Sequence, residues 1–274
     1  MSELFGSNDT HLTKRDIMKE DFGWEIPVEL IPLPSAGLVY SPESMLYKKE
    51  SLKIKAMTAK EEDILSSNAY MKEGTVINHL VKSCVLEQGF NPEELLLGDR
   101  NALLIAIRIT GYGSTYPVKI SCDNCSHVNE LNTALTDIPI KRLNIQPIEH
   151  GKNLFEYQLP VTKKKVTFKF MTAKDEFDNA KRKKNIKRHK LSNTDDTITS
   201  NLFYAIQSID NVTDKNKIRH FINNMPAYDS KEIRKFMREN EPGMDMNFSH
   251  DCNNCTSIID FKIPLTAEFF WPNT

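Results

Sequence analysis

The chain has 274 residues, with 36 lysines and arginines against 37 aspartates and glutamates and a formal net charge of −1 at pH 7. This balance excludes a globally basic nucleic-acid-binding protein and a strongly acidic tail. The sequence lacks both an apolar run of the roughly 18–20 residues that a membrane span needs and an N-terminal signal-peptide pattern. We therefore expect a cytoplasmic protein without membrane contact.

The first 50 residues carry prolines that rule out a long helix. Pro27, Pro32, Pro34 and Pro42 each lack a backbone N–H, and a proline inside a helix also clashes with the preceding turn. We therefore predict that residues 1–50 form an extended N-terminal arm, which lies against the body of the protein or against a partner.

A short segment occurs twice in the rest of the chain. Met-Thr-Ala-Lys begins at residue 57 and again at residue 171, each time after a run (51–56 and 165–170) that alternates polar and apolar residues as a half-buried strand does. Each copy continues with helical periodicity and ends in a strand–CxxC–strand segment. The pattern predicts an α+β fold with two related halves, residues 51–150 and residues 151–274.

The repeated segment also predicts where a helix begins. Thr58 and Glu61 have the spacing of a capping box, in which the threonine caps the helix and the acid reaches back to the threonine N–H. Thr172 and Asp175 have the same spacing with a shorter acid, so we expect a weaker reach-back there. Periodicity predicts further helices at 75–87, 100–110, 197–209, 214–224 and 230–239.

Four of the five cysteines form two CxxC pairs, Cys122 with Cys125 and Cys252 with Cys255. Strand-like runs flank both pairs, so each pair is predicted to lie at the tip of a β-hairpin. Two such tips supply the four thiolates of a closed tetrahedral structural zinc site. We therefore predict one structural zinc per chain, held as in a split zinc ribbon that joins the two halves.

Two other interpretations of the CxxC pairs remain open: reduced thiols without metal, and a redox pair, although a redox CxxC usually begins a helix after a strand. The fifth cysteine, Cys84, lies in an apolar stretch and is predicted to be a core thiol.

Residues 181–190 carry seven positive charges in ten positions. Such a run could contact phosphates, but it contains no aromatic residue on which a base could stack. We interpret it as a solvated helix face or a mobile loop, or as a contact for an acidic partner surface. The alternative function is a zinc-ribbon nucleic-acid-binding module that uses this run.

No sequence pattern indicates an active site. The segment Gly111-Tyr-Gly113 lacks the third glycine and the strand-to-helix context of a phosphate loop, and neither HExxH nor Gly-x-Ser-x-Gly occurs. We therefore expect neither catalysis nor a small-molecule substrate.

Several segments, in this order, resemble the T-even-like bacteriophage baseplate protein family. In the first half they precede the first CxxC pair: 33–40 (LPSAGLVY), 57–65 (MTAKEEDIL), 96–104 (LLGDRNALL) and 108–113 (RITGYG). In the second half they are 221–225 (FINNM), 229–234 (DSKEIR) and 269–272 (FFWP). Members of this family are baseplate hub subunits or hub assembly proteins of phages with contractile tails.

The resemblance implies a non-catalytic protein that acts by protein–protein contact. It would be made in the host cytoplasm, bind other baseplate and hub proteins there, and either stay in the tail baseplate of the virion or leave after assembly.

Overall fold

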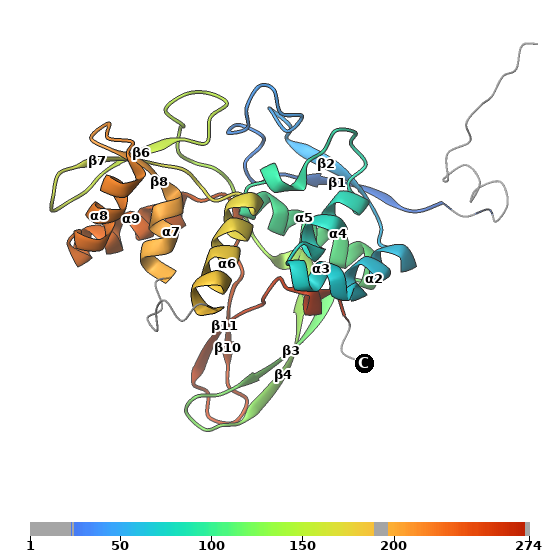
Figure 1. Cartoon of the computed structure of the whole chain (residues 1–274). Coiled ribbons are helices and arrows are strands. Elements are labelled where there is room, and N and C mark those ends of the chain that lie inside the picture. Colours follow the sequence, from blue (N-terminus) through green and yellow to red (C-terminus); the bar gives the residue numbers. More distant parts are fainter. Residues whose placement is uncertain (1–22, 24, 189–196, 272–274) are drawn as a thin grey trace, which may run out of the picture.

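The computed structural model describes residues 23, 25–188 and 197–271, which form a mixed α+β structure with small antiparallel sheets (Figure 1). The elements of the first part of the chain are β1 (Val28–Pro32), β2 (Ser51–Lys55), α2 (Ala59–Ser66), α3 (Asn68–Glu73), α4 (Val76–Cys84), the 3-10 turn Pro92–Glu94, α5 (Leu97–Tyr112), β3 (Thr115–Ser121), β4 (Val128–Ala134), the 3-10 turn Leu135–Asp137 and β5 (Ile140–Lys141).

The second part of the chain adds a three-stranded sheet, four helices and a second long hairpin. Its elements are β6 (Phe155–Gln158), β7 (Lys165–Phe168), α6 (Ala173–Arg188), α7 (Thr197–Ala205), β8 (Ile206–Ile209), α8 (Lys215–Asn224), α9 (Ala227–Asn240), β9 (Gly243–Met244), β10 (Asn247–Asp251), β11 (Ile258–Lys262) and the 3-10 turn Ala267–Phe270. The predicted α+β class is confirmed, whereas the relation between two halves and the domain division stay predictions.

From residue 28 onward, the N-terminal segment lies against the body of the molecule. Strand β1 pairs antiparallel with β2, and Leu33 and Leu46 are fully buried in the larger core. The prolines do exclude a helix, but the apolar residues between them are numerous enough to bury the segment. Residues 1–22, also part of the predicted arm, lie outside the described residues.

A buried carboxylate fixes this N-terminal segment to α5. Asp99, in the first turn of α5, accepts hydrogen bonds from the backbone N–H of Ser35 (2.9 Å), the Ser35 hydroxyl (2.5 Å) and the Tyr40 hydroxyl (2.5 Å). The Tyr40 hydroxyl in turn accepts from the N–H of Leu96 at 3.0 Å. Burial raises the pKa of Asp99, although these hydrogen bonds oppose the shift.

Helix α5 contributes the buried apolar run 102–107 to the protein interior, and it extends beyond the predicted range 100–110 at both ends. Gly98 permits the backbone of α5 to approach β9, because a Cβ at this position would lie 1.8 Å from the carbonyl oxygen of Pro242. The C-terminal part of the chain returns to the same helix, where buried Arg108 donates from Nε to the carbonyl of Phe269 at 3.3 Å.

A smaller core lies between the sheet β6–β7–β8 and helices α7–α9, with Val166, Ile206, Ile218 and Ile233 among its buried residues. The predicted helix over 197–209 is wrong beyond Ala205, since residues 206–209 form β8 and pair with β7. Helical periodicity continues through these residues, but the backbone pairing with β7 outweighs this local preference.

Both predicted helix caps are present. The N–H of Thr58 donates to the Glu61 carboxylate at 3.0 Å, and the N–H of Thr172 donates to the Asp175 carboxylate at the same distance. The expected weaker reach-back of Asp175 is therefore wrong. Lys169, which lies 2.7 Å from Asp175, pairs with this carboxylate beside the cap.

Replacing Thr58 by alanine should lower the free energy of unfolding by about 0.5–2 kcal/mol, because the start of α2 loses its capping side chain. Thr58 also donates its hydroxyl to Glu61 at 2.6 Å, and that bond disappears with the cap. Urea unfolding measures the loss. No measurable change would mean that the cap contributes nothing to the stability of α2.

Stability should fall in acid partly because of Glu61, a fully buried carboxylate. Burial opposes its ionisation, but hydrogen bonds from Lys55, Ser83 and Thr58 outweigh burial and lower the pKa from 4.5 to about 2. The stabilisation is therefore present above pH 4.5 and is lost as the pH falls toward 2. Melting temperatures across this range should fall less steeply in Glu61→Gln than in the wild type; equal slopes would contradict this assignment.

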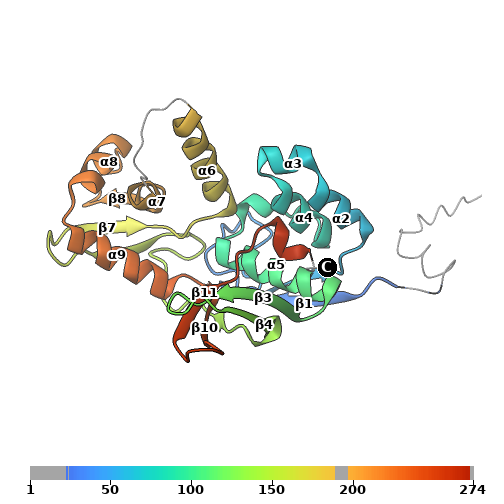
Figure 2. The same cartoon turned by 90° about the horizontal axis from the view of Figure 1, so that it is seen from below.

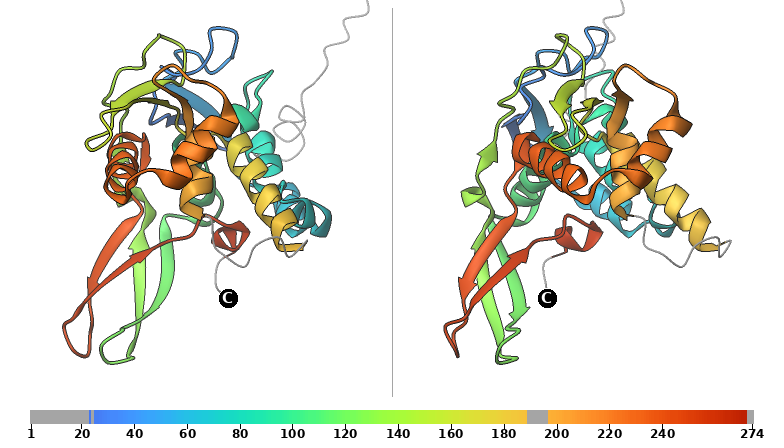
Figure 3. Two further views of the ribbon diagram at one scale, coloured as in Figure 1. Left: turned by 60° about the vertical axis from the view of Figure 1, so that its left-hand side comes forward. Right: turned by 90° about the vertical axis from the view of Figure 1, so that its left-hand side faces the viewer.

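Two hairpins extend from the body of the molecule side by side, and their tips meet (Figures 1 and 3). Strands β3 and β4 form one hairpin, and β10 and β11 form the other. Each hairpin carries a half-buried cross-strand pair, Val118 with Leu131 in the first and Phe248 with Phe261 in the second. The arrangement brings the two CxxC segments together at the end farthest from the core.

Candidate metal centre

Each CxxC segment forms the turn of its hairpin, closed by two backbone hydrogen bonds. In the first turn, the N–H of Cys122 donates to the carbonyl of His127 at 2.9 Å, and the N–H of Ser126 donates to the carbonyl of Cys122 at 2.8 Å. The second turn has the same two bonds at the corresponding positions, each 2.9 Å long, centred on Cys252. The two turns thus share one backbone pattern.

The residue after each second cysteine adopts the left-handed conformation. The φ angle of Ser126 is 58° and that of Thr256 is 60°. A residue other than glycine rarely adopts this region, least of all a β-branched residue such as Thr256, and such strain, of about 1–3 kcal/mol, concentrates at functional sites. Both turns therefore hold a costly backbone conformation at the position that follows the cysteine pair.

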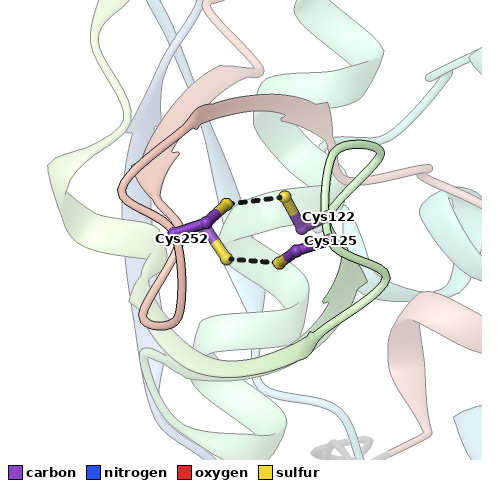
Figure 4. Close-up of side chains that lie close together, drawn as sticks. Cys122, Cys125 and Cys252 are labelled. Atoms are coloured by element: carbon purple, nitrogen blue, oxygen red, sulfur yellow. Dashed lines mark hydrogen bonds between the residues drawn. The ribbon is translucent and has the colours of Figure 1, made fainter.

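The four cysteine sulfurs form one compact cluster (Figure 4). The Sγ atoms of Cys122 and Cys255 lie 3.6 Å apart, as do those of Cys125 and Cys252, and all four lie within 4.8 Å of one another. Four sulfurs placed about 2.3 Å from a central ion form a tetrahedron with edges of about 3.8 Å. The geometry is therefore compatible with a metal site formed by the four predicted cysteines.

Hydrogen bonds favour the ionised form of one thiol. The Ser257 hydroxyl lies 3.4 Å from the Sγ of Cys255, and the Asn124 amide donates to the same sulfur at 3.5 Å. Together they lower the pKa of Cys255 to about 5. Ser257 and Asn124 come from different hairpins, so the charge on this sulfur is stabilised across the contact between them.

The opposite shift occurs at Cys122. The backbone N–H of Cys125 acts to lower its pKa, but burial and the neighbouring thiols of Cys255 and Cys252 raise it to about 11. Four thiols this close do not all ionise together, because their negative charges repel one another. A bound cation removes this repulsion and allows all four thiolates to form.

Asn129 is a residue of the site that the sequence analysis missed. It is fully buried in β4, its amide donates to the Sγ of Cys252 at 3.7 Å, and its carbonyl oxygen accepts from the N–H of Asn253 at 2.9 Å. It therefore fixes the second turn to the first hairpin. The sequence offered one signal for this residue, which was its position in the strand. Asn129 lies two positions from Leu131, so this polar residue is on the same inward-facing side of β4.

The remaining cysteine lies apart from the cluster. Cys84 is fully buried in the larger core, which confirms the prediction of a core thiol, and burial raises its pKa to about 12. Nearby His79 stacks on the ring of Tyr70, with 3.9 Å between ring centroids. A protonated thiol in the core and a stacked imidazole do not form a nucleophile–base pair.

The basic run 181–190 lies mainly on α6, and two of its side chains form hydrogen bonds with the neighbouring helix α7. Arg182 donates to the Ser200 hydroxyl at 2.8 Å, and Lys183 donates to the Thr197 hydroxyl at 3.0 Å, so both contact α7. Lys181 and Lys184 are exposed. The predicted helix face is thus present over the described part of the run, while residues 189–190 lie outside it.

Comparison with known proteins identifies the family. In the described part of the chain, none of the helices has the length and apolar character needed to cross a bilayer. Neither curated proteins nor solved structures give a match. The family model described as T4 bacteriophage base plate protein matches residues 39–271, which include all four clustered cysteines. The chain therefore belongs to the T4 bacteriophage base plate protein family.

Proposed function

We propose that this protein is a structural or assembly component of the hub of a contractile-tail baseplate and that it acts through protein–protein contacts without catalysis. The observation that carries the proposal is the family match over residues 39–271. The protein acts in the host cytoplasm during assembly, where its partners are other baseplate and hub proteins, and it either stays in the virion or leaves after assembly.

We further propose that Cys122, Cys125, Cys252 and Cys255 bind one structural zinc ion per chain. Support comes from the compact sulfur cluster and from the two matching turns that present it. Four thiolates complete the tetrahedral shell of zinc and leave no open position for a substrate, which is typical of structural sites. The ion would fix the two hairpins to each other, although 126 residues separate Cys125 from Cys252.

A duplicated unit explains the paired features of the sequence. Each predicted half has a helix that begins at Met-Thr-Ala-Lys with an acid three residues after the threonine, and each has a CxxC turn with a left-handed residue after it. We propose that the two halves arose from one strand–helices–hairpin unit, and that the shared metal joins the hairpins of the two copies.

Quantitative mass spectrometry of mature particles, tail intermediates and the infected-cell lysate tests the function. A fixed, stoichiometric copy number in particles would support a building block. Presence in tail intermediates but not in particles would support an assembly factor that departs. Presence in the lysate alone would contradict the baseplate role, and a salt-sensitive affinity for DNA or RNA lost on substitution of residues 181–190 would then favour the nucleic-acid module.

A further inference from the structure

A groove of about 850 Å³ separates α6 from α3 and α4. Helices α6 and α3, which Figure 2 shows beside each other, contribute residues to opposite walls of the groove. Its volume lies within the roughly 300–1,000 Å³ range of ligand-binding clefts. The groove lies away from the cysteine cluster, and none of the four cysteines lines it.

The two walls of the groove are held in place by three contacts. Arg100 of α5 pairs with Glu176 of α6 at 2.6 Å. The Nζ of Lys184 donates to the carbonyl of Lys72 at 3.3 Å, and the side chain of Phe177 approaches Gly74 at the end of α3. These contacts join the two walls of the groove in the free chain.

The lining combines an apolar floor with a positive rim. Apolar side chains come from both walls: Met71, Ile77, Ala173, Phe177, Ala180 and Leu265. Met71 is 45% exposed, a large value for an unbranched apolar side chain. Among the lining residues, Lys72, Arg100, Lys181 and Lys184 outnumber Glu73 and Glu176 by two charges, and Arg100 already neutralises Glu176.

We propose that this groove binds an acidic amphipathic segment of another tail protein. Carboxylates of that segment would pair with Lys72, Lys181 and Lys184, and its apolar side chains would cover Met71 and Phe177 in the manner of a helix bound in a groove. The inference rests on the proposed baseplate function, because it takes the partner from the tail.

The apolar lining favours a protein segment over a nucleic acid. Among the described residues that line the groove, Phe177 is the one aromatic side chain, so successive bases would find a single stacking platform. The exposed methionine, by contrast, suits apolar side chains of varied shape.

Lysine labelling in tail intermediates tests the contact directly. Lys72, Lys181 and Lys184 should react with an amine-directed acetylating reagent in the free protein and should be protected in the intermediates, whereas exposed Lys217 on α8 should react equally in both. Carbodiimide, which joins amines to carboxylates at zero length, should link the groove lysines to acids in an apolar-patterned segment of another tail protein. Unprotected lysines, or links only to this chain or to a second copy of it, would overturn the inference.

Charge reversal gives an independent test. The double variant Lys72→Glu with Lys181→Glu should enter tail intermediates at least about tenfold less than the wild type, because like charges would face the acidic segment. The matched variant Lys217→Glu should enter normally, and all three proteins should melt at similar temperatures. Normal entry of the folded double variant would overturn the groove proposal alone, whereas failure of the wild type to enter any intermediate would overturn the baseplate function itself.

Discussion

Replacing Cys122 by serine should lower the melting temperature by on the order of 10 °C and should release the metal. The variant loses one of four thiolates in a site whose zinc binding contributes on the order of 10 kcal/mol in comparable domains. Chelation of the wild type should have a similar effect. Hydrogen exchange should then increase first in β3, β4, β10 and β11, because these hairpins lie outside the main core and the proposed ion joins their tips.

The control for this prediction is Cys84→Ala. It removes a thiol from the core, so it should cost some stability through a small cavity, yet it should leave the metal content unchanged. An unchanged melting transition after complete chelation would contradict the structural role of the site. The hairpins would then be held by side-chain packing and by Asn129 without help from a metal.

Replacing Asp99 by alanine should lower the free energy of unfolding by about 3–5 kcal/mol. The change leaves three buried donors, two on Ser35 and one on Tyr40, without their acceptor, and each unsatisfied donor costs about 1–3 kcal/mol before relaxation. These donors belong to the N-terminal segment, so its packing against α5 should loosen. Urea unfolding and hydrogen exchange of residues 33–50 measure the two effects.

Two further variants distinguish the loss of this hydrogen-bond network from a general loss of core packing. Tyr40→Phe keeps the ring but removes one donor to Asp99 and the acceptor of the Leu96 N–H, so it should cost about 1–3 kcal/mol, which is less than Asp99→Ala. Exposed Asp63→Ala on α2 should be close to neutral. A cost below about 1 kcal/mol for Asp99→Ala would mean that water replaces the lost carboxylate, and the network would not anchor the segment.

Local chemistry predicted several element boundaries well. Asp214 caps α8 by accepting from the N–H groups of Asn216 and Lys217, which matches the predicted start at residue 214. The Thr58 and Thr172 caps are also in place. Each of these caps is formed by residues two or three positions apart, so the local sequence is enough to predict it.

Features that depend on distant partners were harder to predict. The strand β8 exists because residues 206–209 meet β7, and nothing within the run itself distinguishes it from the end of a helix. The prolines of the N-terminal segment exclude a long helix, but they do not show how the segment is anchored, because the carboxylate that holds it, Asp99, lies 64 residues beyond Ser35.

The sequence predicts that the four cysteines come together, but it does not predict the side chains that support the cluster. Two identical CxxC spacings allow four sulfurs to be assigned to one cluster, and the structure brings them within 4.8 Å of one another. Asn129 and Ser257 are single polar residues in strand-like or turn segments, and their contacts with sulfur follow from the meeting of two hairpins. No residue spacing in the sequence predicts the contact between the two hairpins.

The metal content of the purified full-length protein is the most direct test of the proposed zinc clamp. Elemental mass spectrometry of protein prepared without chelators should give close to one zinc per chain, and Cys122→Ser should fall well below that value. A wild-type protein that is folded, fully reduced and free of zinc and other transition metals would contradict the account.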